Sequence, residues 1–192
     1  MALPPGQFSR NSDHLEPLVI IVTVKINEPA PDFTLPALDG DLVRLGSLRG
    51  KIVILNFWSC ECPHAERTDR DLMAMFVQWR DEVVLLPVAS NSIESAPALE
   101  EAARRRRLPP VLMDAGHFVA DLYEAETTPH VFVIDRDGVL RYRGAVDNAS
   151  FLQRRPTRFF LEEAVEALLA GRLPETAETP AYGCAIVREA LE

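Results

Sequence analysis

The stretch that decides the fold is Ile52-Val-Ile-Leu-Asn-Phe-Trp58, followed at once by Ser59-Cys60-Glu61-Cys62-Pro63. The first seven residues are nearly all apolar, which is the pattern of a strand buried on both faces within a sheet. Residues 63–80 then repeat apolar side chains at helical spacing. A buried strand that turns directly into a helix predicts an α/β unit with two cysteines in the turn.

Strands and helices alternate on the C-terminal side of this unit. The patterns predict strands over residues 83–89, 111–113, 131–134 and 139–143, and helices over residues 94–107, 117–123 and 158–170. Asp135-Arg-Asp-Gly138 between the last two strands is a hairpin signal. On the N-terminal side, residues 18–26 and 42–45 predict short strands. We therefore expect a three-layer α/β/α sandwich with a mixed central sheet and an N-terminal β extension.

The length of 192 residues and a hydrophobic content of 47% suit one soluble domain. Residues 1–17 carry prolines, a glycine and polar side chains, and are interpreted as a loose N-terminal arm. Residues 18–172 form the expected domain. Residues 173–192 form a tail that carries Cys184.

The charge balance is 20 basic against 29 acidic residues, a net charge of −9, which argues against nucleic acid or an anionic membrane as partner. The run Arg104–Arg107 is interpreted as the solvated last turn of a helix rather than as a phosphate site. The longest apolar run, residues 18–24, is far below the ~20 residues that span a bilayer. No signal-peptide pattern precedes it, so we expect a cytoplasmic protein.

Three cysteines in a reducing compartment favour reactive or metal-binding thiols over a structural disulfide framework. Pro63 at the first helical position would make Cys62 the N-cap residue. Unpaired N–H groups and the positive end of the helix dipole would then favour the Cys62 thiolate, which is the reactive form. Cys60 lies farther from the helix and gains less.

The chain resembles the thioredoxin-fold alkyl hydroperoxide reductase/thiol-specific antioxidant (AhpC/TSA, redoxin) superfamily over roughly residues 29–170. The motifs that carry the resemblance are Pro31-Asp-Phe33, Leu48-Arg-Gly-Lys51, Ile54-Leu-Asn-Phe-Trp58, the Cys-Pro turn, Thr128-Pro129 and Tyr142-Arg-Gly144. The tail, with Tyr182-Gly183-Cys184, is similar to a peroxiredoxin-like branch with a late Gly-Cys. The resemblance implies a thioredoxin-like fold and a thiol-dependent antioxidant oxidoreductase, either a peroxidase or a disulfide reductase, without a cofactor.

Within this resemblance, Cys62 falls on the attacking cysteine of the family. The second cysteine of the usual Cys-x-x-Cys motif would be residue 65, which is Ala65 here. Leu55 stands where peroxiredoxins have proline, although Ser59 matches their Thr or Ser. Asn56 stands where thioredoxin has a buried carboxylate, so no general base is assigned.

Thr128-Pro129 resembles the cis-proline loop that faces the nucleophile in this fold, and its backbone would pair with an extended substrate segment. Pro129 therefore joins the catalytic set. His64, at the helix start, is a candidate for assisting proton transfer, and His130 lies next to the same loop. The expected substrate-contacting residues are Trp58, Ser59, Pro63, His64 and Thr128.

Two thiols could resolve a sulfenic acid or mixed disulfide on Cys62. Cys60 is close, but a Cys-x-Cys disulfide closes a strained ring. Cys184 lies beyond the last helix and could reach the site, because loop-closure entropy grows only with the logarithm of length. We expect Cys184 to be the resolving thiol, a thioredoxin-type protein to be the reductant, and a peroxide or disulfide to be the substrate; a homodimer remains open.

The same residues allow a second class of function. Cys60, Cys62 and His64 together offer the soft ligands that Cu(I) or Zn(II) prefers. Copper-delivery proteins on a thioredoxin fold usually space their cysteines Cys-x-x-x-Cys, from which Cys-x-Cys departs. The metal-binding alternative therefore stays open beside thiol redox chemistry.

Overall fold

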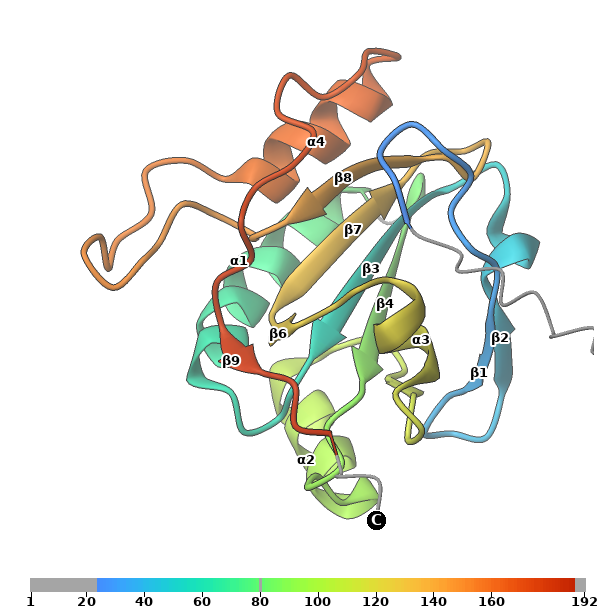
Figure 1. Cartoon of the computed structure of the whole chain (residues 1–192), viewed down its shortest axis with the longest axis vertical. Coiled ribbons are helices and arrows are strands. Elements are labelled where there is room, and N and C mark those ends of the chain that lie inside the picture. Colours follow the sequence, from blue (N-terminus) through green and yellow to red (C-terminus); the bar gives the residue numbers. More distant parts are fainter. Residues whose placement is uncertain (1–23, 80, 189–192) are drawn as a thin grey trace, which may run out of the picture.

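The computed structural model describes residues 24–79 and 81–188. A five-stranded sheet in the order β5-β4-β3-β7-β8 forms the middle layer (Figure 1). Its strands are β3 (Ile52–Trp58), β4 (Val83–Ala89), β5 (Leu112–Met113), β7 (His130–Ile134) and β8 (Leu140–Gly144). β3, β4 and β5 run parallel, whereas β7 is antiparallel to β3 and β8 is antiparallel to β7. The predicted mixed sheet is therefore confirmed.

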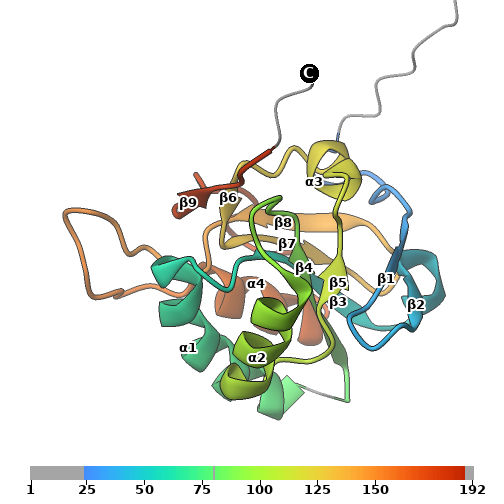
Figure 2. The ribbon, with the colours of Figure 1, turned by 90° about the horizontal axis from the view of Figure 1, so that it is seen from below.

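Helices cover the two faces of the sheet unequally (Figure 2). One face carries α1 (Pro63–Trp79), α2 (Ala96–Arg106) and α4 (Phe160–Leu169). The other carries the short α3 (Phe118–Leu122) and the hairpin of β1 (Thr34–Pro36) and β2 (Leu42–Arg44), after which a 3-10 helix spans Leu45–Leu48. The expected N-terminal β extension is this hairpin, which seals the second face where a long helix is missing.

β3 is the centre of the molecule because its side chains supply both cores. Val53, Leu55 and Phe57 pack toward α3 and the hairpin, while Ile52 and Ile54 pack toward α1 and α4. All seven residues of β3 are buried, including the polar Asn56, as the nearly continuous apolar run predicts. The C-terminal end of this rigid strand is where the cysteine turn begins.

Two sequence expectations need correction. Most of the strand expected over residues 18–26, and the whole arm of residues 1–17, lie outside the described residues; the described part, Val24–Ile26, is not a strand. There the chain turns at Asn27, whose φ is +66°, and the Asn27 N–H donates to the Leu140 carbonyl. The Arg104–Arg107 run is not wholly solvated either, because the Arg106 side chain is 7% exposed and forms an ion pair inside the protein.

Beyond α4 the tail returns along the edge of β8 and then across the end of the sheet (Figure 1). Its residues Cys184–Ala185 form β9, which pairs antiparallel with β6 (Thr127–Thr128). The pairing sets Cys184 opposite Thr128. The tail therefore reaches the Thr128-Pro129 loop, as the resolving role of Cys184 requires.

Candidate active site

Cys62 occupies the junction between β3 and α1. α1 begins at Pro63, and the Cys62 carbonyl accepts the hydrogen bond from the Glu66 N–H at 3.0 Å. This is the position that the Cys-Pro pattern predicts, immediately before the first helical residue. Cys62 is 2% exposed, so its thiol lies beneath other parts of the chain rather than on an open surface.

The pKa of the Cys62 thiol is lowered from its ordinary value. Burial by itself raises it, but hydrogen bonds to the sulfur, chiefly from the Cys184 thiol and the Ala65 N–H, outweigh burial. The Ala65 N–H is one of the unpaired donors in the first turn of a helix. As a thiol, Cys62 instead donates to the Thr128 carbonyl oxygen at 2.9 Å, and this hydrogen bond favours the protonated form. The balance favours a reactive thiolate.

Cys184 is the nearest thiol to Cys62. The two sulfur atoms lie 2.7 Å apart, and both cysteines are free. The pKa of Cys184 is raised to about 11 by burial, by its hydrogen bond to Cys62 and by the charge of Cys62. Cys62 thus ionises first, and Cys184 holds its proton beside it.

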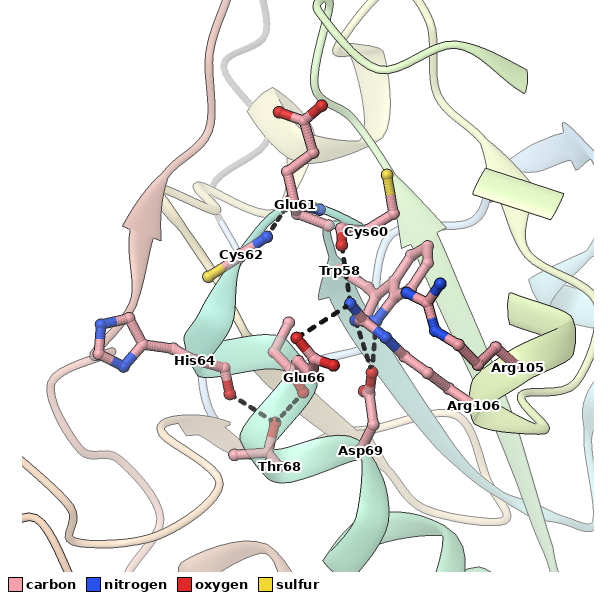
Figure 3. Close-up of polar contacts among 12 residues, drawn as sticks. Trp58, Cys60, Glu61, Cys62, His64, Glu66, Thr68, Asp69, Arg105 and Arg106 are labelled. Carbon is pink, nitrogen blue, oxygen red and sulfur yellow. Dashed lines mark hydrogen bonds and ion pairs between the residues drawn. The ribbon is translucent and has the colours of Figure 1, made fainter. Parts of the chain in front are cut away.

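Cys60, by contrast, is held in its protonated state. Burial and the neighbouring Glu94 carboxylate raise the pKa of its thiol to about 12. Its sulfur also points away from that of Cys62, as Figure 3 shows. The environment therefore separates the two cysteines of the turn, with Cys62 as the ionisable thiol and Cys60 as a thiol that keeps its proton.

A carboxylate and a hydroxyl fix the shape of the turn. The buried Ser59 hydroxyl donates to Glu94 Oε1 at 2.7 Å, and the same Ser59 oxygen accepts the N–H groups of Glu61 and Cys62. Glu94 Oε1 also accepts the Glu61 N–H at 3.0 Å. Ser59 therefore acts on the backbone of the turn. No local pattern in the sequence pointed to Glu94.

A buried charged network lies below the turn (Figure 3). Asp69 Oδ2 accepts hydrogen bonds from the Trp58 indole N–H and from Arg106, each at 3.0 Å. Arg106 also donates to the Cys60 carbonyl at 2.7 Å and lies over the Trp58 ring. The Trp58 side chain is wholly buried, so it supports the turn from below. Asp69 lies between Ala65 and Leu72 on the apolar face of α1, which is the one signal in the sequence that marks it.

His64 and His130 each pack against an aromatic ring. The half-buried His64 ring packs edge-on against Tyr182 of the tail, with ring centroids 4.8 Å apart. His130 packs against Phe132, and burial lowers its pKa to about 4, so this ring is neutral at pH 7. Pro63 is exposed at the helix start.

The Thr128-Pro129 peptide bond is cis, as the resemblance implied. Thr128 is buried and contacts Cys62 through its carbonyl oxygen. The loop therefore faces the nucleophile, and β9 occupies the edge of β6 where an extended substrate was expected.

The metal ligand set proposed from the sequence is not gathered in space. Cys60 and Cys62 direct their sulfurs apart, and His64 turns toward Tyr182. Across residues 24–79 and 81–188 no group of three His, Cys, Asp or Glu side chains is arranged to hold a metal ion. In the same residues no helix is long and apolar enough to cross a membrane.

A family model described as AhpC/TSA family matches residues 26–143, which include the cysteine turn and the cis-proline loop. The chain belongs to the AhpC/TSA family. The predicted family is thus confirmed, whereas the narrower likeness to a branch with a late Gly-Cys stays a prediction.

Curated relatives of this AhpC/TSA member carry the name thiol-disulfide oxidoreductase ResA. The protein from Geobacillus kaustophilus is 32% identical over 119 residues, which are 62% of this chain and 68% of the relative. The protein from Bacillus cereus is 28% identical over 116 residues, 60% of this chain and 66% of the relative. The chain thus spans about two thirds of the length of these relatives, and their names agree with the expected class of thiol-dependent oxidoreductase.

Solved structures confirm the expected fold. An uncharacterised conserved protein from Geobacillus kaustophilus has a TM-score of 0.80 at 26% identity, covering 88% of this chain and 94% of its own. The thioredoxin domain of a thiol-disulfide oxidoreductase from Bacteroides vulgatus has a TM-score of 0.57 at 18% identity, covering 62% of this chain and 88% of its own. The AhpC/TSA member therefore has a thioredoxin-like α/β fold.

Proposed function

We propose that this protein is a thiol-disulfide oxidoreductase in which Cys62 attacks the substrate and Cys184 resolves the intermediate. The observation that carries the proposal is the 2.7 Å separation of the two sulfurs, combined with a lowered pKa for Cys62 and a raised one for Cys184. The names of the ResA relatives support the same chemistry.

The first step is attack of the Cys62 thiolate on one sulfur of a substrate disulfide. A bond forms between Cys62 and that sulfur, the substrate S–S bond breaks, and the second substrate sulfur leaves as a thiolate that takes up a proton. Cys60 cannot replace Cys62 in this step, because a thiol with a pKa of about 12 is almost wholly protonated near pH 7.

The second step uses Cys184, and forming the mixed disulfide activates it. The negative charge of Cys62 and the hydrogen bond to it are two of the causes that raise the pKa of Cys184. Both vanish once Cys62 is bonded to substrate, so Cys184 loses its proton more easily at that stage. Its thiolate then attacks Cys62, closes the Cys62–Cys184 disulfide and releases the substrate thiolate. An external dithiol, which we expect to be a thioredoxin-type protein, reduces this disulfide.

A disulfide substrate fits the surroundings of Cys62 better than a peroxide. Within the described part of the chain, no arginine or lysine side chain donates a hydrogen bond to Cys62. A charged donor there would stabilise the oxygen that leaves when a peroxide O–O bond is cleaved. The pairing of β9 with β6, by contrast, shows that the loop beside Cys62 accepts an extended chain. We keep peroxide reduction as the competing outcome of the test.

The test compares disulfide reduction with peroxide consumption by the full chain, using a thioredoxin system as electron donor. Cys62→Ser should abolish turnover. Cys60→Ser should keep most of it, and Cys184→Ser should stop after one turnover with substrate bound to Cys62. Equal loss from Cys60→Ser and Cys62→Ser, or peroxide consumption without disulfide reduction, would contradict the proposal. Gel filtration of the same preparation tests whether a homodimer forms. Fractionation of the cells that make the protein tests the expected cytoplasmic location.

A further inference from the structure

The tail lies beside Cys62 in the manner of a bound peptide, and we call the space that it fills, between Asn91-Ser92 and residues 126–128, the groove. On one side, the Ile186 N–H donates to the Glu126 carbonyl at 2.9 Å, next to the β6–β9 pairing. On the other, the Val187 N–H donates to Asn91 Oδ1 at 2.8 Å, and the Val187 carbonyl accepts the Ser92 N–H at 3.1 Å. Residues 183–187 are thus held between two loops that carry the rim of the site.

The position before the cysteine has no room for a side chain. A Cβ at Gly183 would overlap the Thr128 carbonyl oxygen and lie 2.5 Å from the Thr128 carbonyl carbon and 3.0 Å from the Pro129 nitrogen. These are backbone atoms of the loop and not the ends of flexible side chains. The groove therefore accepts glycine at this position and excludes larger residues.

The positions after the cysteine differ from each other. Ala185 is exposed, so the groove makes no demand on its side chain. Ile186 is 6% exposed and belongs to the same apolar core cluster as Val119, Ala120 and Ala125. An aliphatic residue two positions after the cysteine is therefore buried, which adds affinity in proportion to its apolar area.

We propose that this groove selects disulfide substrates in which the attacked cysteine is preceded by glycine and followed, two residues later, by an aliphatic residue. The inference rests on the proposed function and adds a substrate class to it: an extended peptide segment of the pattern Gly-Cys-x-aliphatic. In the register of β9, such a segment sets its cysteine opposite Thr128 and its sulfur beside Cys62. Attack of Cys184 on Cys62 then releases the peptide, and the tail takes its place in the groove.

The test uses the full chain with Cys60→Ser and Cys184→Ser, in which Cys62 is the only thiol. The probe is the peptide Ala-Tyr-Gly-Cys-Ala-Ile with its cysteine in a mixed disulfide with thionitrobenzoate. Cys62 attacks the peptide sulfur, forms a Cys62–peptide disulfide and releases coloured thionitrobenzoate, so the rate is read directly. The tail competes equally with every peptide, so ratios between peptides report the groove.

Three substituted peptides each test one position of the Gly-Cys-x-aliphatic pattern. Alanine in place of glycine should lower the second-order rate about tenfold or more, because the added Cβ overpacks the loop. Serine in place of isoleucine should lower it about tenfold, and serine in place of the alanine after cysteine should leave it within about twofold. Each rate is divided by the rate of the same peptide with free cysteine, which removes differences in intrinsic reactivity.

Equal rates for the glycine and alanine peptides would overturn the inference. The proposed function is judged separately, by the reaction of the same variant with the small disulfide Ellman's reagent. Rapid reaction with that reagent but no choice among peptides would refute the specificity alone. A Cys62 that does not react with that reagent would refute the proposed function.

Discussion

Gly183→Ala is the sharpest perturbation of the contact between the tail and the active site. The added Cβ would lie 2.5 Å from the Thr128 carbonyl carbon and closer still to its oxygen, and ordinary contact begins at 3.4 Å, so the strand must move by at least about 0.9 Å. Overpacking of this kind costs about 1–3 kcal/mol, which corresponds to about 5-fold to about 150-fold in the balance between the docked and the undocked tail.

The assay follows alkylation of Cys62 in the reduced protein. Since Cys62 is 2% exposed under the docked tail, its alkylation requires the undocked state and should accelerate by the same factor. Closure of the Cys62–Cys184 disulfide under a mild oxidant should slow, because the sulfurs no longer start 2.7 Å apart. Gly116→Ala is the matched control, since a Cβ there meets nothing within 4 Å. Wild-type rates for Gly183→Ala in both measurements would refute the reasoning.

Three further predictions concern the other ionisable groups of the site. Cys62→Ser should lower the pKa of Cys184 below about 11, because the charge and the hydrogen bond of Cys62 help to raise it; alkylation against pH measures this, and an unchanged value would contradict the activation step. Glu94→Gln should lower the pKa of Cys60 from about 12 while burial keeps it above the ordinary value, so Cys60 alkylation at alkaline pH should accelerate; no acceleration would remove the electrostatic explanation. Asp69→Ala should reduce the free energy of unfolding in urea by about 3 kcal/mol, because it removes the buried partner of Arg106 and leaves that buried guanidinium only the exposed Glu66 carboxylate, 3.7 Å away. A loss under about 1 kcal/mol, typical of exposed pairs, would show that the network is dispensable.

The elements that sequence reasoning located correctly are those with a strong local pattern. Ile52–Trp58 and Val83–Ala89 are found at their predicted bounds, because strands buried on both faces leave a nearly continuous apolar run. Pro63 likewise marked the start of α1. The short β6 and β9 could not be read from the sequence, because each is defined only by its pairing with the other.

The pairing of the two reactive cysteines could be predicted from redox chemistry, although no local sequence pattern marks it. Cys184 was matched to Cys62 because a lasting redox cycle needs a second thiol, although 122 positions separate them. Arg106 was misjudged as solvated because its partner, Asp69, lies 37 positions away on another helix. The buried Glu94, which fixes the turn, gave no signal because its role depends on the return of a loop to the end of β3.

Peptide mapping of the mildly oxidised full chain tests the central claim most directly. The protein is treated with a limiting amount of a small disulfide, blocked at its free thiols, digested and analysed by mass spectrometry. The account predicts a Cys62–Cys184 disulfide within one chain, with Cys60 blocked as a free thiol. A Cys60–Cys62 disulfide, or Cys62 oxidised to sulfinic acid while Cys184 stays free, would contradict it.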